Sequence, residues 1–469
     1  MKRNSQSSKP RAVWLFEQFY GLLNRWILLP LLSILVGVVI TSRITNWYFG
    51  TYPYKIYVVG NMNDSFSVAK QINDGFTKEF EARGEELKTF EGAALTFAQE
   101  DDRGDPTRAH QIAEKIARQP DTLMVIGHTA SGQSKEALPV YLATQPPIPV
   151  ILTTETNPDL VPAKIRKHKF RPVFRLLPTD KIQARAAADF IEEQAAASDK
   201  SIWVVQDLSG IGNHVYSSYL ADEFVKDVGS SRTHVVLWSN NLSSPSPKAL
   251  IDLNIGWVFF PGGWRPALVL IRELKQLYQK IDKDQMPTIV LTDASAEQQL
   301  ITAGGSDVED VYLTYPMKVE EKGRDNSIYG QNAARVIEGL IEDDNNSLDS
   351  DEVADQCRTI GYHFRSLMGI KRVGDARCVL SALMQEAEED RRPFLLSEEK
   401  KIAFGVDEDG EDGVRVDKDA TFYVWQVQGK GTLEQFANVT SHQAPTMVAT
   451  TPVSPRAAVT PVTAIGLPH

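Results

Sequence analysis

Metal-binding and nucleophile motifs are missing from this sequence. It has no C-x-x-C and no H-E-x-x-H pattern, and its eight histidines are scattered, so none of the spacings typical of a metal site occurs. It also has no glycine-rich phosphate loop and no catalytic triad order. Around Ser131, the two positions that a nucleophile elbow reserves for glycine hold Thr129 and Gln133. We therefore expect no metal, no cofactor and no enzymatic activity.

Cysteine is scarce as well. Cys357 and Cys378 are the only two, and an even number in an exported protein is compatible with one disulfide. Two unrelated buried thiols would explain the same count. The sequence leaves both interpretations open.

Dense positive charge is absent beyond the N-terminus. The chain carries 50 Lys and Arg against 61 Asp and Glu, a formal net charge of −11. Binding to a phosphate backbone requires clustered Lys and Arg, so we expect no nucleic-acid partner. The composition, 42% hydrophobic and 24% charged, is typical of a globular protein, and 469 residues suffice for two or three lobes.

One long apolar run is present, at residues 26–42, after a basic leader over 1–25. A cleaved signal peptide would explain such a run, but residues 40–44 are a poor cleavage site. We expect an uncleaved transmembrane anchor, short and with Pro30 inside it. The positive-inside rule places the basic leader in the cytoplasm. The predicted protein is thus a single-pass protein of the cytoplasmic (inner) membrane, with its folded part periplasmic or extracellular.

The stretch from 122 to 160 reads as strand, loop, helix, strand and loop. Apolar runs at 122–126 and 150–152 flank a helix that ends near 143, which predicts a parallel βαβ unit. Ligands of open α/β sheets lie beyond the carboxyl ends of the strands. The loops at these ends carry Ser131 and, in the second, Thr154 and Thr156. Their hydroxyls and backbone amides suit a small anion such as a carboxylate, although polar surface loops are also common.

The same alternation of strands and helices runs from residue 55 to 342, with a break at 164–180 after which it restarts. Two successive βα sets predict two α/β lobes with a cleft between them. Residues 390–428 are predicted to be rich in β-structure. The acidic turn at 407–413 is interpreted as a hairpin, because a calcium loop starting at Asp407 requires glycine where Asp412 stands. The tail at 437–469, which has almost no charge, is expected to be disordered.

Several segments, in this order, resemble the type I periplasmic binding proteins, in particular the leucine/isoleucine/valine-binding receptors of ABC transporters. The resemblance spans about residues 55–430 and rests on these motifs: Asp101-Asp102-x-x-Asp105-Pro106, Val125-Ile126-Gly127-His128, Pro149-Val150-Ile151 running to Thr156-Asn157-Pro158, Arg175-x-x-Pro178-Thr179-Asp180-x-x-Gln183, Gly262-Gly263 and Val311-Tyr312-Leu313.

The resemblance implies two Rossmann-like parallel-sheet lobes joined by three crossing strands. It assigns residues 54–177 and 296–385 to lobe one, and residues 178–295 and 386–436 to lobe two. The crossings are expected near 175–179, near 291–295 and within 385–400.

The family's ligand-binding positions carry over unevenly. The serine that holds an amino-acid carboxylate aligns with Ser131, and the loop that assists it aligns with Thr154 and Thr156. The acidic residue that pairs with the ammonium group aligns with Asp293, which the local sequence also allows as a helix cap.

The walls of the ligand pocket depart from the family pattern. Where the family has an aromatic residue before Gly212, this chain has Ile211, and Trp264 is expected to supply the other wall. Glu155, inside the carboxylate loop, is unusual. If it faced the ligand, it would disfavour an anion.

The resemblance implies a membrane-tethered solute-binding protein that captures an amino acid, an amide or a similar small polar ligand and delivers it to an ABC permease. Two alternatives stay open: a sensory subunit that signals through a membrane partner, and a scaffold that has lost its ligand.

Overall fold

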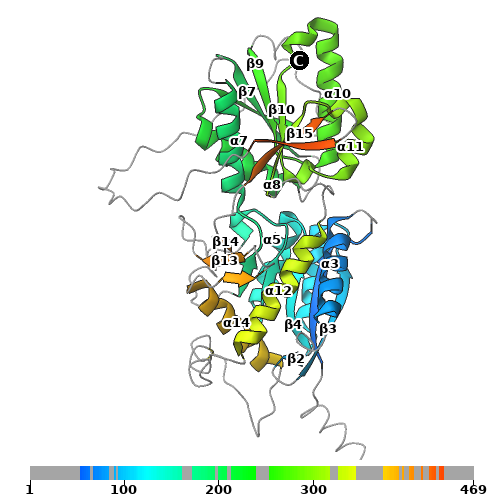
Figure 1. Cartoon of the computed structure of the whole chain (residues 1–469), viewed down its shortest axis with the longest axis vertical. Helices are drawn as coiled ribbons and strands as arrows, with labels where there is room; N and C mark the ends of the chain where they lie inside the picture. Colours follow the sequence, from blue (N-terminus) through cyan, green and yellow to red (C-terminus); the bar gives the residue numbers. More distant parts are fainter. Residues whose placement is uncertain are drawn as a thin grey trace, which may run out of the picture.

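The computed structural model divides the chain into two α/β lobes (Figure 1). The residues that the structure describes are 53–63, 67–83, 89–90, 93–160, 172–195, 199–208, 213–238, 253–316, 326–344, 357, 373–389, 393–395, 401–405, 414–415, 422–428 and 432–437. The predicted anchor at 26–42 and the predicted disordered tail after residue 437 lie outside them. Within the described residues, no helix has the length and apolar character needed to cross a membrane.

Lobe one contains a six-stranded sheet with the order β2-β3-β1-β4-β5-β6. All pairs are parallel except β2 with β3. β3 pairs with one edge of β1, and β4 pairs with the other edge. The topological switch point therefore lies between β1 and β4, and ligands of such sheets bind at this point. The strands are β1 (Tyr54–Gly60), β2 (Thr89–Phe90), β3 (Ala93–Asp101), β4 (Thr122–Gly127), β5 (Val150–Leu152) and β6 (Val173–Arg175).

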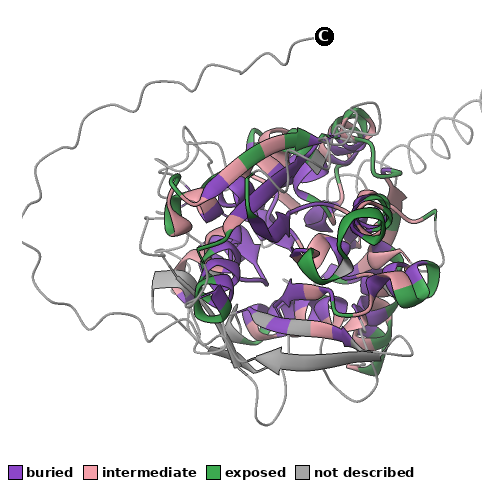
Figure 2. Cartoon of the chain, turned by 90° about the horizontal axis from the view of Figure 1, so that it is seen from above, coloured by how far each residue is buried: buried purple, intermediate pink, exposed green. Residues whose placement is uncertain are grey.

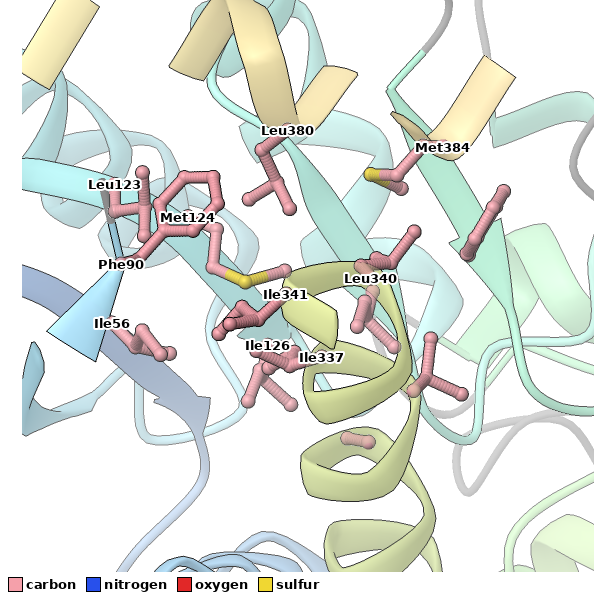
Figure 3. Close-up of a cluster of buried hydrophobic side chains, with 14 of the residues drawn as sticks. Ile56, Phe90, Leu123, Met124, Ile126, Ile337, Leu340, Ile341, Leu380 and Met384 are labelled. Carbon is pink, nitrogen blue, oxygen red and sulfur yellow. The ribbon is translucent and has the colours of Figure 1, made fainter. Parts of the chain in front are cut away.

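Helices cover both faces of this sheet. Alternate side chains of β1 point to opposite faces, so the strand packs against helices on both sides. Ile56 and Val58 pack against one set of helices, and Tyr57 and Val59 pack against the other. The first set is α3 (Val68–Ala82), α12 (Ser327–Asp344) and α14 (Val373–Glu389), and the second is α4 (Pro106–Ala117) and α5 (Ser131–Leu142). Figure 3 shows the first interface, where Ile337 and Leu380 from the late helices meet Met124 of β4.

Local signals in the sequence fix the starts of two of these helices. The Ser67 hydroxyl caps α3 by accepting from the backbone N–H of Lys70 at 3.1 Å. Asp105 caps α4 in the same way through the backbone N–H of Arg108 at 2.8 Å, and Pro106 is the first helical residue.

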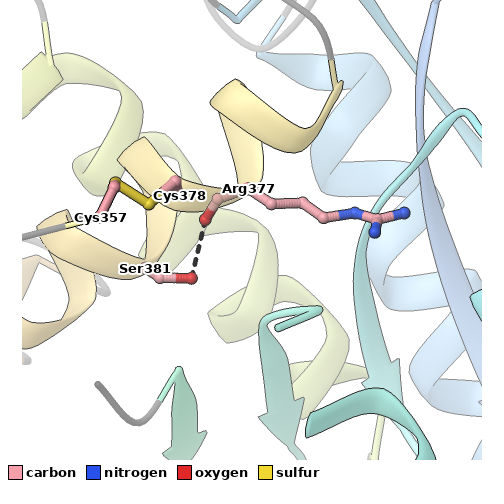
Figure 4. Close-up of a disulfide and its surroundings, with 4 residues drawn as sticks. All are labelled: Cys357, Arg377, Cys378 and Ser381. Carbon is pink, nitrogen blue, oxygen red and sulfur yellow. Dashed lines mark hydrogen bonds between the residues drawn. A yellow bond between two sulfur atoms is a disulfide. The ribbon is translucent and has the colours of Figure 1, made fainter. Parts of the chain in front are cut away.

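Helix α14 is held to the chain before it by a disulfide between Cys357 and Cys378, whose Cα atoms are 6.1 Å apart (Figure 4). The sequence leaves open whether these cysteines form a disulfide or are two unrelated buried thiols, and the structure shows the disulfide. In the same helix, the Ser381 hydroxyl donates to the Arg377 carbonyl at 2.7 Å.

Lobe two contains a seven-stranded sheet with the order β16-β15-β11-β10-β9-β7-β8. The strands from β8 to β11 are parallel, and β15 and β16 add antiparallel pairs at one edge. These strands are β7 (Ser201–Asp207), β8 (Thr233–Trp238), β9 (Ile255–Phe260), β10 (Thr288–Leu291), β11 (Tyr312–Tyr315), β15 (Tyr423–Gln428) and β16 (Thr432–Ala437).

Two pairs of helices enclose the second sheet. Helices α7 (Asp180–Ala195) and α8 (Asn213–Val228) cover one face, and α10 (Trp264–Ile281) and α11 (Gln298–Gly304) cover the other. Buried residues form most of the strands and the inward faces of the helices, and the outward helix faces are exposed (Figure 2). The strand β8 is an exception, because it exposes Val235 and Leu237. Four short 3₁₀ turns complete the described elements: η2 (Pro158–Leu160), η3 (Lys283–Gln285), η4 (Asp293–Ser295) and η5 (Gly305–Val308).

The structure corrects the predicted lobe boundaries in two places. The family resemblance assigns residues 296–316 to lobe one, but β11 pairs with β10 and β15 in the second sheet. Conversely, it assigns β12 (Pro393–Leu395), β13 (Lys401–Gly405) and β14 (Val414–Arg415) to lobe two, yet these strands contact α12, α14 and β6 of lobe one. The chain therefore passes between lobes after β6, after β11 and after β14. The second and third crossings lie about 20–30 residues further along than the sequence predicts.

Candidate functional site

A cavity of about 540 Å³ lies between the two lobes, and its walls come from both. It opens where β1, β4 and β5 end in lobe one and where β9 and β10 end in lobe two. Five of the six residues predicted to bind a ligand line it: Ser131, Thr154, Thr156, Trp264 and Asp293. The sixth, Ile211, lies outside the described residues. Contact of the five with a ligand stays a prediction, but their convergence on one cavity is what that prediction requires.

The N-terminus of α5 forms part of the lobe-one wall. Ala130, its N-cap, makes no side-chain cap, and Ser131 is only 6% exposed. Both residues line the cavity. The first N–H groups of a helix have no partner within it, and here no capping side chain occupies them. An uncapped helix N-terminus beside a hydroxyl is suited to binding a carboxylate.

The neighbouring loop after β5 is held in place by Glu155. This side chain is 1% exposed and accepts hydrogen bonds from the Ser134 hydroxyl at 2.7 Å and from the backbone N–H groups of Thr153 and Thr154 at 2.8 and 2.9 Å. Burial raises the pKa of Glu155 to about 7, although these hydrogen bonds oppose the shift. The carboxyl group does not line the cavity. It therefore does not face the ligand in the way that would disfavour an anion.

The hydroxyl of Thr154 ties the two loops to each other, because it donates to the backbone carbonyl of Thr129 at 3.0 Å. Both threonines line the cavity. The loop after β4 and the loop after β5 thus form one connected surface.

A buried polar chain supports this surface from below. Nδ1 of His128 lies 2.7 Å from Oδ2 of Asp102, and Nε2 lies 3.1 Å from the Tyr141 hydroxyl. Burial, together with the Asp102 charge, raises the pKa of Tyr141 well above its usual value, so its hydroxyl keeps its proton. Oδ1 of Asp102 accepts from the N–H of Gly104 at 2.8 Å. These hydrogen bonds link the ends of β3 and β4 and fix both next to the cavity.

On the opposite wall, Asp293 is positioned by two side chains from lobe two. Its Oδ1 accepts from Nε2 of Gln183 at 2.9 Å and from the Tyr216 hydroxyl at 2.5 Å. Burial, followed by the charge of Asp293, raises the pKa of Tyr216 well above its usual value, which keeps the hydroxyl a donor. Thr292, not Asp293, occupies the N-cap of η4 and makes no side-chain cap. Asp293 thus lies in the cavity wall, bonded to side chains.

Trp264 opens α10 and lines the cavity, with the Arg265 guanidinium 5.1 Å from its ring centre. It supplies an aromatic surface on the lobe-two side of the cavity, and its contact with a ligand stays a prediction. Tyr216 and Tyr329, from α8 and α12, also line the cavity.

Sequence reasoning misses the supports of Asp293 and one part of the wall. Gln183 belongs to one of the family motifs, but its bond to a residue 110 positions away is not readable from the sequence. Tyr216, within the first turn of a helix after a strand, gives no signal of its own. Gln133 stands out in the sequence only as a departure from a nucleophile motif, yet it lines the cavity.

Comparison with protein-family models finds none that matches the chain, and no curated protein matches it. Solved structures do. A leucine binding protein from Thermotoga maritima superposes with a TM-score of 0.59 at 18% identity, covering 82% of this chain and 98% of its own. A solute binding protein of an ABC transporter from R. palustris, in complex with benzoate, gives 0.55 at 14% identity, covering 82% and 95%. A periplasmic binding protein type 1 from Bordetella pertussis gives 0.54 at 14% identity, covering 82% and 100%.

These similarities establish the fold. The chain has the two-lobed architecture of the type I periplasmic binding proteins, with a parallel sheet in each lobe. The resemblance read from the sequence motifs is confirmed at that level.

Proposed function

We propose that this protein is a solute-binding protein that captures a small ligand between its two lobes. The ligand carries a carboxylate, and the class that we propose is an α-amino acid. The observation that carries the proposal is the polarity of the cavity. An uncapped helix N-terminus with Ser131 lies on one wall, and the carboxylate of Asp293 lies on the other. The two walls are complementary to the two charged ends of an amino acid.

In this mechanism, the ligand carboxylate accepts from the first N–H groups of α5 and from the hydroxyls of Ser131 and Thr156. Thr154 holds the loop beside them, since its hydroxyl donates to the Thr129 carbonyl. The ammonium group donates to Asp293, whose orientation is fixed by Gln183 and Tyr216. Charge-assisted hydrogen bonds of this kind are roughly twice as strong as neutral ones. Because the two ends of the ligand contact different lobes, binding favours the closed arrangement of the lobes over an open one.

Two structural neighbours bear on the ligand class. One is a leucine binding protein and another was solved in complex with benzoate. Leucine and benzoate share a carboxylate, which supports the proposed role of the α5 N-terminus as a carboxylate site. The cavity volume of about 540 Å³ suits a small molecule.

We further propose that the ligand is delivered to an ABC permease and that residues 26–42 tether the protein to the cytoplasmic membrane. A tether would keep the binding domain at a high effective concentration near the permease. A sensory subunit with the same lobes is the second candidate function. Such a subunit would signal through a membrane partner.

The test is thermal melting of the full-length protein with a panel of amino acids, amides, urea and small carboxylates. A ligand at a hundred times its Kd stabilises the fold by about 2.7 kcal/mol. Asp293→Asn keeps an acceptor for Gln183 and Tyr216 but removes the charge. It is expected to weaken binding of the active amino acid by roughly ten- to a hundredfold.

The matched control is Asp284→Asn, which removes an exposed carboxylate of the same lobe outside the cavity. It should leave the ligand-induced shift unchanged. If no compound moves the melting temperature of the wild type, the solute-binding proposal fails. If an uncharged amide or urea binds and no amino acid does, the ammonium contact fails.

A further inference from the structure

The loop after β5 holds a buried carboxyl group that makes none of the proposed ligand contacts. Glu155 stands between Thr154 and Thr156, which both line the cavity, whereas Glu155 itself does not. It is 1% exposed, and the hydrogen-bond partners of its carboxyl group among the described residues are uncharged: the Ser134 hydroxyl and two backbone N–H groups. A buried charge without an opposite charge beside it is costly, so such a group readily takes up a proton.

The hydrogen bonds around Glu155 accommodate both of its charge states. In the ionised state, the Ser134 hydroxyl donates to Oε1 at 2.7 Å, and the N–H groups of Thr153 and Thr154 donate to Oε2. When Oε1 carries a proton, it donates to Oγ of Ser134, and the Ser134 hydroxyl then donates to the His128 carbonyl, which lies 3.3 Å from it. The two bonds to Oε2 persist in both states. The proton therefore enters without displacing the loop.

This carboxyl group lies directly behind the proposed carboxylate site. Ser134 is the fourth residue of α5, whose N-terminus forms that site, and Thr154 belongs to the neighbouring wall. Glu155 thus bonds to both elements that would surround the ligand carboxylate. It does not contact the ligand, but charges interact well beyond contact distance where water is excluded. An ionised Glu155 therefore opposes a bound carboxylate, and a protonated one does not.

Other ionisable side chains contact this loop or the loop beside it. From β6, Arg175 donates to the backbone carbonyl of Glu155 at 3.2 Å. From α7, the backbone N–H of Asp180 bonds to the same loop at 2.8 Å. Behind the loop after β4, Asp102 pairs with His128 at 2.7 Å. The Glu155 carboxyl group forms an ion pair with none of them. The substitution Glu155→Gln leaves all four in place, so it separates their titration from that of Glu155.

We propose that Glu155 is a positioning residue whose protonation is coupled to ligand binding, such that a carboxylate bound at α5 drives proton uptake by Glu155. The inference rests on the proposed function, since it requires an anion at that site. By reciprocity, the protonated protein binds the carboxylate more tightly than the ionised protein does. Burial raises the pKa of Glu155 to about 7, so the coupling operates near neutral pH. Capture is strongest in mildly acidic solution and weakens as the pH rises.

The experiment is calorimetric titration of the full-length protein with the tightest binder among the common amino acids and benzoate. At about pH 7.5 it is run in phosphate and in Tris, whose ionisation enthalpies differ, so that the difference in measured heat gives the number of protons taken up. We expect roughly half a proton per ligand. We also expect the affinity to fall roughly tenfold from about pH 5.5 to about pH 8.5.

Binding without proton uptake, at an affinity constant within about twofold over this pH range, would overturn the coupling and leave the proposed function intact. An affinity that rises with pH would also overturn it. Protonation of Asp293 acts in that direction, because it removes the charge that faces the ligand ammonium, whereas protonation of Glu155 acts in the opposite one. If none of these compounds binds at any pH, the proposed function fails, and this inference fails with it.

Two variants assign the effect to this carboxyl group. Glu155→Gln keeps an acceptor for the loop N–H groups and offers an N–H₂ group to Ser134, so it resembles the protonated state. Its affinity should stay within about threefold of the acid-side value of the wild type at every pH, without proton uptake. Ser134→Ala removes a hydrogen bond that lowers the pKa of Glu155, so the fall in affinity should move to higher pH.

The matched control is Glu136→Gln, which removes an exposed carboxyl group of the same helix outside the cavity. It should show the pH dependence and proton uptake of the wild type. Proton uptake that persists in Glu155→Gln would overturn the assignment, because the titrating group would then be a different one, such as His128 or Asp180.

Discussion

The two lobes share one architecture but complete their cores differently. In lobe two, the described residues of the buried clusters lie at 184–315, with Val424 and Val427 added from β15. In lobe one, the cluster on one face joins residues 54–177 to residues 329–387, which lie beyond the whole of lobe two in the sequence. The first lobe therefore cannot complete its core until the chain has passed through the second.

Close contact between α3 and α12 holds this late segment in place. Ion pairs join Glu79 to Arg335 at 2.8 Å and Arg83 to Glu338 at 2.9 Å. At Gly330 the backbones approach so closely that a Cβ would lie 1.9 Å from the carbonyl oxygen of Ile72. No comparable contact between distant helices is present among the described residues of lobe two. The stability of lobe one therefore depends on a few contacts between helices that are distant in sequence.

The largest effect is expected from Gly330→Ala. The added methyl group meets backbone atoms of α3, which have no rotamer to change, so the helices must separate. We expect the free energy of unfolding to fall by about 3 kcal/mol or more, despite the better helix propensity of alanine. Urea unfolding of the full-length protein measures it.

Gln331→Ala, one residue further along the same helix, is the control. Its side chain makes only a 3.4 Å contact with the Ser327 hydroxyl, and the substitution should change stability by less than about 1 kcal/mol. If Gly330→Ala were equally mild, the dependence of lobe one on this helix contact would be wrong.

A somewhat smaller effect is expected from removing the disulfide. Cys357 and Cys378 are 21 residues apart, and closing a loop of this size stabilises a protein by about 3 kcal/mol in the chain-entropy model. Cys378→Ser should lower the melting temperature, and a reducing agent should lower that of the wild type but not that of the variant. Ligand binding in the cavity should be retained, because the disulfide lies in α14 and not in the cavity wall. Insensitivity of the wild type to reduction would contradict a structural role for this bond.

Local features were predictable from the sequence, and the assignment of segments to lobes was less so. The strand β10 at 288–291 and the helix α3, with Ser67 as its cap, both lie within the segment where the sequence predicts alternating strands and helices. These elements are specified by apolar periodicity and capping residues within the segment itself. The convergence of Ser131 and Asp293 on one cavity was also expected, but from the family resemblance and not from any local pattern.

The errors concern partners that are distant in sequence. The short strand β11 has the same apolar pattern whichever sheet it joins, so its pairing with β10 was not readable. Helix α14 was not predicted, and its place in the core follows from contacts with α12 and β4. The hydrogen bond by which Tyr216 positions Asp293 forms only in the folded structure, where α8 lies next to η4. Such contacts depend on the tertiary fold, which propensity and periodicity do not encode.

The last contrast is between two carboxyl groups near the proposed ligand site. Asp293 of lobe two lines the cavity, whereas Glu155 of lobe one is buried behind it and holds its own loop. The folded protein binds a proton on Glu155 up to about pH 7, while the unfolded chain loses it near pH 4.5. Between these values the native state binds more protons, so the free energy of unfolding falls as pH rises, by at most about 3 kcal/mol from this group.

Glu155→Gln should therefore gain stability relative to the wild type as pH rises from 5 to 8, since the variant has no buried carboxyl group to ionise. The melting temperatures of both proteins across this range measure the difference. Glu79→Gln is the opposing control. Burial raises the pKa of Glu79, but its pairing with Arg335 and Arg83 outweighs this and lowers it, so that variant should gain nothing at high pH. If the difference in melting temperature between Glu155→Gln and the wild type stays constant with pH, Glu155 does not titrate in this range. The contrast between the two lobes would then rest on packing alone.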